Sequence, residues 1–376
     1  TFPYALSWSK GKGPASSWGI AISESEPSKR GFGPIEYNGA SKYYINPVGI
    51  QSMIMSAKEL GKNTILSIDQ IGPHSARINL KKDGPSFPTI QMPLVQGMPF
   101  VTGTFVGGTP LIQSGVYFKS MTKVATNPKS GIVKYNFLLE DGTTWRVYGH
   151  NTKGQALNLK IVNNGLAEST RPFTGTLQIA KDPKTGNSER ALDECAGVYP
   201  TGLTLTGSVS GTTGSYSFRF KRAGYKTGAI YMYALPHHVA SFDAATKRNV
   251  QTATIVTGTK GTATLVRTAV WTMVETNLPT SMGYAPWDGI RDRKTLSTSA
   301  KNAIRDVALL EVSQDMNAQS NLDSMYFSGK ALLKFAQVVY VINDLIGDKA
   351  LGQAGLAKLK EAYAVFSRNQ QKYPLV

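Results

Sequence analysis

Three polar side chains in the last quarter of the sequence have the spacing of one helical face. Asp323, Tyr326 and Lys330 lie at positions i, i+3 and i+7, so a helix would bring together a carboxylate, a phenol and an ammonium. Such a stripe suits a carbohydrate cleft, where the ring stacks on a sugar and the ions bond its hydroxyls. The alternative is a capping Asp323 and a solvated Lys330. The spacing alone leaves both interpretations open.

Glycosidic hydrolysis requires two carboxyl groups that face the scissile bond. The sequence has 24 Asp and Glu residues, but no spacing among them identifies a catalytic pair, so the catalytic residues stay unassigned. Five tryptophans could serve as sugar platforms, although each is more typical of a hydrophobic core: Trp8, Trp18, Trp145, Trp271 and Trp287.

Metal-dependent and esterase-type chemistry is not indicated. The sequence lacks H-E-x-x-H, C-x-x-C and G-x-S-x-G, so we expect neither a metal nor a cofactor. His237 and His238 would point to opposite faces of an extended segment, so this pair alone cannot form a two-histidine ligand set. Together with His74 and His150 they are expected to be structural, and Cys195 is expected to be a lone buried thiol.

The elements that must position these residues change in character along the chain. The first 290 or so residues contain short alternating or β-branched segments, and Asp141-Gly142 and Asn164-Gly165 are strong hairpin signals between them. These segments are residues 132–139, 144–148, 156–162, 215–220, 229–235 and 262–275. Many short strands without intervening helices predict an antiparallel β-sandwich, with residues 47–60 as the one candidate helix.

Helical periodicity begins at residue 297. It predicts helices over residues 297–316, 323–346 and 354–370, with Asp323 as an N-cap and Gly347 as a C-terminal stop. Residues 338–342 are apolar nearly all round, so this helix requires neighbours on several sides. We therefore predict two domains: a β-sandwich domain with a linking region over residues 1–290, and the incomplete start of a helical domain over residues 291–376.

The charge of the chain is strongly basic but dispersed. Its 376 residues include 41 Lys and Arg residues against 24 acidic ones, a formal net charge of +17. The basic residues form no long run and accompany no RNA-binding signature, so we expect no nucleic-acid partner. No apolar run is long enough to cross a membrane, and any targeting peptide is expected to be missing already, because Thr1 begins no signal-like segment.

Four segments together resemble glycoside hydrolase family 81, which contains endo-β-1,3-glucanases of fungi, bacteria and some plants. They are residues 46–52, 93–102, 234–238 and 323–330, and the run Pro-Leu-Val-Gln-Gly-Met at residues 93–98 is specific to the family. The resemblance covers essentially the whole chain in the family's order. It implies a mainly β and then α fold, with an N-terminal antiparallel β-sandwich followed by the first helices of an α/α toroid.

The resemblance also implies an activity and its participants. Family members hydrolyse β-1,3-glucan with inversion and without a metal, using an Asp in a His-rich segment and a Glu in a later segment. Neither segment occurs here, so this chain alone is expected to be inactive. Asp323, Tyr326 and Lys330 match a family segment and are expected to contact the glucan. We expect a monomer, secreted or associated with the cell wall; the alternatives are a non-catalytic glucan-binding sandwich module and a polyanion-binding protein.

Overall fold

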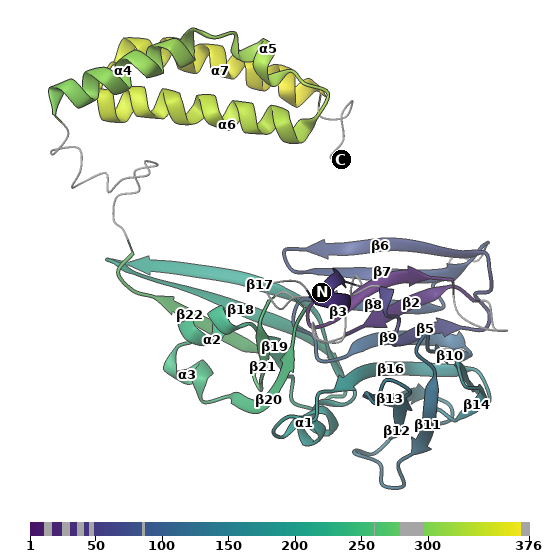
Figure 1. The fold of residues 1–376 in the computed structure, drawn as a ribbon. Helices are drawn as coiled ribbons and strands as arrows, with labels where there is room; N and C mark the ends of the chain where they lie inside the picture. The colour runs from purple at the N-terminus through teal and green to yellow at the C-terminus, as the bar shows by residue number, and fades with distance from the viewer. Residues whose placement is uncertain are drawn as a thin grey trace. The chain divides into compact units, whose positions relative to one another are not determined.

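The chain divides into two compact units, Thr1–Asn277 and Leu278–Val376, called here the β unit and the helical unit (Figure 1). The computed structural model describes residues 1–10, 17–24, 31–35, 41–44, 49–84, 87–258, 260–278 and 297–369. The mainly β character of the chain, followed by helices, agrees with the prediction from sequence.

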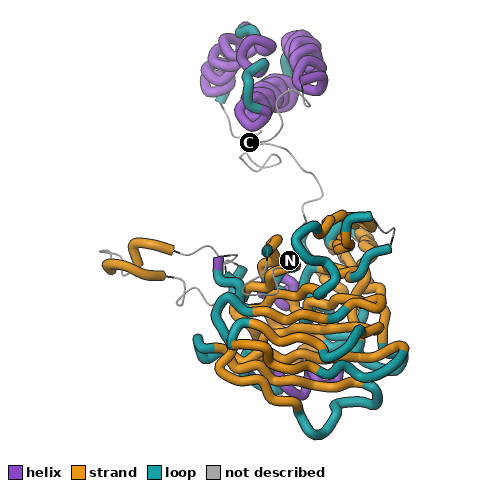
Figure 2. Tube along the Cα trace, turned by 90° about the vertical axis from the view of Figure 1, so that its right-hand side faces the viewer, coloured by secondary structure: helices purple, strands orange, loops and turns teal. Residues whose placement is uncertain are grey.

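Two large antiparallel sheets form most of the β unit (Figures 1 and 2). One sheet has six strands, in the order β1 (Ala5–Ser9), β2 (Gly19–Ser23), β5 (Met53–Ala57), β10 (Pro110–Gln113), β15 (Leu166–Ser169) and β14 (Leu159–Asn163). The other has eight, in the order β11 (Phe118–Lys123), β12 (Ile132–Leu139), β13 (Thr144–Lys153), β16 (Phe173–Asp182), β9 (Val101–Gly108), β8 (Ile90–Val95), β7 (Ser75–Lys82) and β6 (Thr64–Gly72).

Smaller sheets and short helices complete the β unit. Two sheets have three strands each: β17 (Val198–Ser210), β18 (Thr213–Gly224) and β22 (Val270–Glu275), and β19 (Met232–Ala234), β21 (Thr262–Val266) and β20 (Val250–Val256). A pair is formed by β3 (Gly31–Ile35) and β4 (Ser41–Tyr44). The helices are α1 (Ser188–Cys195), α2 (Pro236–Ser241) and α3 (Ala244–Lys247).

One hydrophobic core receives side chains from both large sheets. Met55 and Ile112 of the six-stranded sheet belong to the same buried cluster as Ile90 and Phe105 of the eight-stranded sheet. A glycine permits a close approach on β9, because a Cβ at Gly103 would lie 2.4 Å from the sulfur of Met55. The two sheets therefore share an apolar interior, whose burial stabilises the β unit.

The hairpins predicted from Asp-Gly and Asn-Gly are confirmed. Strand β12 pairs with β13 across the turn at residues 140–143, and Gly142 has a φ of 80°, a conformation that glycine adopts without strain. Strand β14 likewise pairs with β15 across Asn164, and the Asn163 side chain accepts a hydrogen bond from the backbone N–H of Gly165. Local turn chemistry was thus sufficient to locate these strands.

The predicted helix over residues 47–60 is wrong. Within the described part of this segment, residues 53–57 form β5, whose five residues are all buried between β2 and β10. A strand that is covered on both faces shows no alternation, so its apolar run cannot be told from that of a buried helix. Within the described residues of the β unit, the helices are α1 to α3, and they lie where the sequence predicts none.

The lone cysteine lies in the interior as predicted. Cys195 ends α1 and packs in a cluster with Ala191 and Leu192. Burial raises the pKa of its thiol far above the ordinary value, so the thiolate is not formed at neutral pH. The residue therefore serves as a small apolar core side chain.

The helical unit contains α4 (Thr298–Ser313), α5 (Met316–Ser320), α6 (Met325–Val341) and α7 (Lys349–Asn369), with a π-helical turn at Ile342–Ile346 after α6. Gly347 ends this turn with a φ of 82°, which confirms the predicted stop. The first predicted helix is interrupted because Asp315 caps a new helix, its carboxylate accepting a hydrogen bond from the backbone N–H of Ala318. In the described ranges, no helix is long and apolar enough to cross a membrane.

A small buried cluster holds the four helices together. Phe335 of α6 is fully buried, and it belongs to a cluster with Val312 of α4, Met316 of α5 and Ala362 of α7. The helices thus converge on one face of α6. Several large apolar side chains of the helical unit are nevertheless exposed, among them Leu333 and Tyr363.

Candidate functional site

The first turn of α6 presents two exposed aromatic rings beside an ammonium group. Tyr326 and Phe327 are 56% and 57% exposed, and their ring centroids lie 5.2 Å apart in an edge-to-face arrangement. The Nζ atom of Lys330 lies 4.5 Å from the centroid of the Tyr326 ring and 5.9 Å from that of Phe327. The ammonium therefore makes a cation–π contact with the phenol ring, as expected for side chains one helical turn apart.

Asp323 does not share this helical face. The N-cap of α6 is Ser324, whose hydroxyl accepts a hydrogen bond from the backbone N–H of Phe327, so the predicted cap at Asp323 is wrong by one residue. Asp323 precedes the helix in an exposed turn, where helical periodicity does not apply. The hydroxyl of Ser328 fixes this turn against α6 through a 3.2 Å hydrogen bond from the N–H of Leu322. Of the three predicted residues, the structure brings Tyr326 and Lys330 into contact.

This arrangement has the chemistry of a sugar contact. An exposed tyrosine ring can pack against the C–H face of a pyranose, and its hydroxyl can exchange hydrogen bonds with sugar hydroxyls. The Lys330 ammonium adds up to three donors on the same side of the helix. A site of this kind binds and orients a neutral polyol but supplies no acid or base for bond cleavage.

Two of the five tryptophans have the structural role that is more typical of this residue. Trp145 and Trp271 are 0% and 1% exposed and belong to the core of the β unit. Trp8 is partly exposed and lies with its ring centroid 5.1 Å from that of Trp18. The fifth, Trp287, lies outside the described residues.

The two adjacent histidines occupy a helix rather than an extended segment. His237 and His238 lie in the first turn of α2, which begins at Pro236, and their ring centroids are 4.1 Å apart. The argument for opposite faces holds only for an extended segment and does not apply here, because Pro236 is at the first position of a helix, where proline is favoured. Within the parts of the chain that the structure describes, no group of three or more His, Cys, Asp or Glu residues could hold a metal ion.

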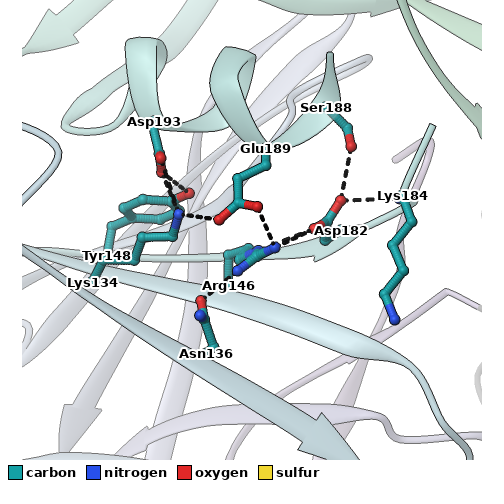
Figure 3. A network of polar contacts seen from close by, with 9 residues as sticks. All are labelled: Lys134, Asn136, Arg146, Tyr148, Asp182, Lys184, Ser188, Glu189 and Asp193. Atoms are coloured by element: carbon teal, nitrogen blue, oxygen red, sulfur yellow. Dashed lines mark hydrogen bonds and ion pairs between the residues drawn. The ribbon is translucent and has the colours of Figure 1, made fainter. Parts of the chain in front are cut away.

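A network of ion pairs joins α1 to the eight-stranded sheet (Figure 3) and contains the carboxylates of Asp182, Glu189 and Asp193. Lys134 of β12 is 3% exposed, and its Nζ atom lies 2.7 Å from Glu189 and 2.8 Å from Asp193. The guanidinium of Arg146, from β13, lies 2.5 Å from Asp182 and 3.0 Å from Glu189. Figure 3 shows the three carboxylates directed at these two cations. Sequence reasoning missed this network because its members come from four separate segments.

The electrostatics of this network indicate a structural clamp. Burial alone would raise the pKa of Asp182, but hydrogen bonds from Arg146, from the backbone N–H of Lys184 and from Ser188 outweigh burial and lower it. A general acid of a glycosidase needs a carboxyl whose pKa is raised. Asp182 is ionised at neutral pH and is held by cations, so it fastens α1 to the sheet rather than protonating a leaving group.

Both parts of the sequence match domains of one enzyme family. Residues 1–289 match the glycosyl hydrolase family 81 N-terminal domain, and residues 295–376 match the family 81 C-terminal domain. A protein of Arthroderma benhamiae named glucan endo-1,3-beta-D-glucosidase is 45% identical over 100% of this chain and 42% of its own length. The primary septum glucan endo-1,3-beta-D-glucosidase of Schizosaccharomyces pombe is 33% identical over 89% of this chain and 32% of its own length.

A solved structure agrees with these matches in fold. A glycoside hydrolase family 81 protein from Clostridium thermocellum superposes with a TM-score of 0.63, covering 96% of this chain and 44% of that one, at 15% sequence identity. At this level of identity the likeness concerns the fold. The chain spans less than half the length of each of these relatives.

Proposed function

The chain belongs to glycosyl hydrolase family 81, and from this premise we propose that it is the N-terminal part of an endo-β-1,3-glucanase. The observation that carries the proposal is the 45% identity, over the whole chain, to a protein named glucan endo-1,3-beta-D-glucosidase. The proposed substrate is a neutral β-1,3-glucan, and the proposed reaction is hydrolysis of its internal bonds with inversion. No part of this chemistry requires a cofactor.

Inverting hydrolysis needs a pair of carboxyl groups that the network beside α1 does not supply. An inverting pair is separated by roughly 6.5–9.5 Å so that water fits between base and sugar, and the acid must be protonated. The carboxylates of Asp182, Glu189 and Asp193 are instead bound to Lys134 and Arg146, which suits none of them to the role of acid. The family resemblance points to segments that do not occur in these residues. We therefore propose that this chain alone binds glucan without cleaving it.

The architecture proposed for this part follows the family. Residues 1–290 would form a β-sandwich with a linking region, which is supported by the single core shared between two antiparallel sheets. Residues 291–376 would contribute the first helices of an α/α toroid, which is supported by the helices that share one buried cluster and by the exposed apolar side chains Leu333 and Tyr363. A monomer acting outside the cell or in its wall agrees with a glucan substrate.

The proposed glucan contacts in the helical unit are Tyr326, Lys330 and, from the turn before α6, Asp323. Tyr326 would stack on a glucosyl ring, and the neighbouring ammonium would donate hydrogen bonds to its hydroxyls. Asp323 would accept from hydroxyls at the edge of the same surface. All three side chains are exposed, so their replacement changes little of the interior.

Replacing Lys330 by alanine in the longer enzyme should lower kcat/KM on soluble β-1,3-glucan about tenfold or more, because a charged hydrogen-bond donor to substrate contributes about 1.5–3 kcal/mol. The thermal midpoint should stay within about 1 °C, since exposed positions contribute little to stability. Lys334→Ala is the matched control: it removes an ammonium one turn further along α6, where Lys334 pairs with Glu311. If kcat/KM is equal for Lys330→Ala, Lys334→Ala and the parent enzyme, Lys330 does not contact the substrate.

The function itself is tested by product analysis with that longer enzyme. An endo-β-1,3-glucanase should reduce the viscosity of linear β-1,3-glucan early and release oligosaccharides of mixed length, while leaving β-1,4-glucan intact. Release of single glucose units from the chain end, or activity on β-1,4-glucan alone, would contradict the proposed function. Binding to glucan should also resist salt, because a neutral polymer releases no counterions. Steep weakening with salt would favour the polyanion-binding alternative.

A further inference from the structure

A cavity of about 400 Å³ in the β unit is lined by aromatic rings and imidazoles. Phe218 of β18 and Trp271 of β22 form part of its wall, together with His237 and His238 of α2 and His74 from the turn between β6 and β7. This volume falls within the range of about 300–1,000 Å³ that is typical of small-molecule sites. The cavity therefore has room for a sugar ring.

The rings of this cavity are packed into one aromatic cluster. The ring centroid of Phe218 lies 5.6 Å from that of His74, 5.5 Å from that of His238 and 6.1 Å from that of Trp271. Trp271 also packs against Phe220, with ring centroids 4.9 Å apart, and against Phe242, at 5.6 Å. A partly buried Phe218 on this rigid support offers an apolar surface that can pack against the C–H face of a pyranose.

The most buried imidazole of the cavity, that of His238, is held in its neutral form. The backbone N–H of Leu235 donates a 3.3 Å hydrogen bond to Nδ1 of His238, which places the remaining proton on Nε2. Burial, reinforced by His237 and His74, lowers the pKa of His238 to about 4. His238 therefore acts as a neutral donor and not as a cation. His237 and His74 are exposed and free to contact a ligand at the cavity mouth.

The remaining lining disfavours cationic ligands and adds a further hydrogen-bond donor. Among the described residues that line the cavity none is acidic, and Lys260 is the one permanent cation, which disfavours cationic ligands. The buried indole N–H of Trp271 has no hydrogen-bond partner within the described residues, so the wall keeps an unused donor. Aromatic surface combined with neutral donors and acceptors is the chemistry that recognises a polyhydroxylated, uncharged ring.

Two sequence segments that carry the family resemblance meet at this cavity. Gln96, from residues 93–102, lines it together with His237 and His238, from residues 234–238. The loop around Gln96 is held in place because its backbone N–H donates to the carbonyl of His74, while the neighbouring Gly97 carbonyl accepts from Tyr233. The cavity is therefore built from parts that are fixed by backbone hydrogen bonds.

We propose that this aromatic–histidine cavity of the β unit binds a glucosyl unit of β-1,3-glucan. Phe218 stacks on the ring, and the imidazoles of His74, His237 and His238 exchange hydrogen bonds with its hydroxyls. The identity of the sugar rests on the proposed function. The contact itself rests on the lining of the cavity.

The test uses the 376-residue chain with a linear β-1,3-glucohexaose, followed by calorimetry and by ¹H–¹⁵N spectra of the histidine side chains. The signals of His74, His237 and His238 should shift on titration. His150 is the internal control, because its ring packs against Tyr225 and does not line the cavity, so its signals should stay unchanged. Inorganic phosphate, titrated separately at pH 7, serves as the anionic probe.

Variants then show whether the cavity of the β unit contributes to the affinity for the hexaose. His237→Ala, at an exposed position, should raise Kd about fivefold, and Phe218→Leu should raise it about tenfold through loss of the stacking face. Tyr326→Ala should leave the three histidine shifts in place.

Several results would refute the proposed binding of a glucosyl unit in this cavity. These are unchanged affinity in both His237→Ala and Phe218→Leu, binding of phosphate in place of the hexaose, or equal binding of a β-1,4-glucohexaose. If Tyr326→Ala loses all binding of the hexaose while the cavity variants keep it, the proposed contact in the cavity is refuted. The proposed function would then still stand. A different result would refute the proposed function: the longer enzyme would not hydrolyse β-1,3-glucan.

Discussion

Replacing Arg146 by methionine is expected to lower the free energy of unfolding of the β unit by about 3–5 kcal/mol. Arg146 is buried, and its guanidinium makes two hydrogen bonds to Asp182, at 3.1 and 2.5 Å, and a third to Asn136 at 2.6 Å. Methionine fills similar space but leaves the Asp182 carboxylate, which is itself buried, without its cation. A buried charge without a partner costs far more than the pair contributes when intact. Urea unfolding at pH 7 measures the change.

The pH dependence of this effect identifies its cause. The pKa of Asp182 is lowered in the folded protein, so its contribution is present above the unfolded value of 3.8 and is lost as pH falls through the folded value. The deficit of Arg146→Met should therefore shrink as the pH falls below 3.8 towards the lower folded value, because the ion pair is lost when the Asp182 carboxyl becomes protonated. Arg190→Ala is the control, because Arg190 is 80% exposed and its pair with Glu194 contributes about 0.5 kcal/mol or less. Equal free energies of unfolding for Arg146→Met and Arg190→Ala at pH 7 would refute the structural role of the pair between Arg146 and Asp182.

Replacing Phe335 by alanine is expected to destabilise the helical unit by about 3–5 kcal/mol, the usual cost of deleting a buried phenylalanine. The helical unit has one small core, and Phe335 at its centre is fully buried among residues of α4, α5, α6 and α7. A loss of this size is a large fraction of the stability of a small unit, which is about 5–15 kcal/mol for ordinary domains. Amide hydrogen exchange of residues 298–369 should accelerate strongly, while exchange in the β-unit core should change little.

Phe327→Ala provides the matched control for this prediction. Phe327 lies on the same helix but is 57% exposed, so its removal should change stability by about 0.5 kcal/mol or less. The two variants delete the same atoms, and only burial differs between them. Similar exchange rates in both variants would mean that the cluster around Phe335 does not hold the helical unit together.

The sequence predicts well those elements whose signal is local. Asp141-Gly142 marks a hairpin because few residues accept the backbone conformation of Gly142, and Gly347 ends its helix for the same reason. The pairing of Tyr326 with Lys330 follows from helical geometry alone. Strand β5 was mistaken for a helix because burial on both faces removes the alternation that identifies a strand.

The parts that depend on distant contacts could not be predicted. Asp182 and Arg146 are brought together by the pairing of β13 with β16, and no pattern near either residue indicates a partner. His74 approaches Phe218 only because the turn after β6 lies beside the hairpin of β17 and β18. The sequence does not reveal the helix that holds His237 and His238, because α2 has only six residues, too few for periodicity to show.

The most direct test compares two proteins on soluble linear β-1,3-glucan: the 376-residue chain, with its mass confirmed, and a longer form that carries the catalytic segments of the family. Reducing-sugar release is measured for both, and binding is measured for the short chain. We predict release by the longer form, and binding without release by the short chain. Clear release by the short chain would contradict this interpretation, because an acid–base pair would then exist among its 24 carboxylates.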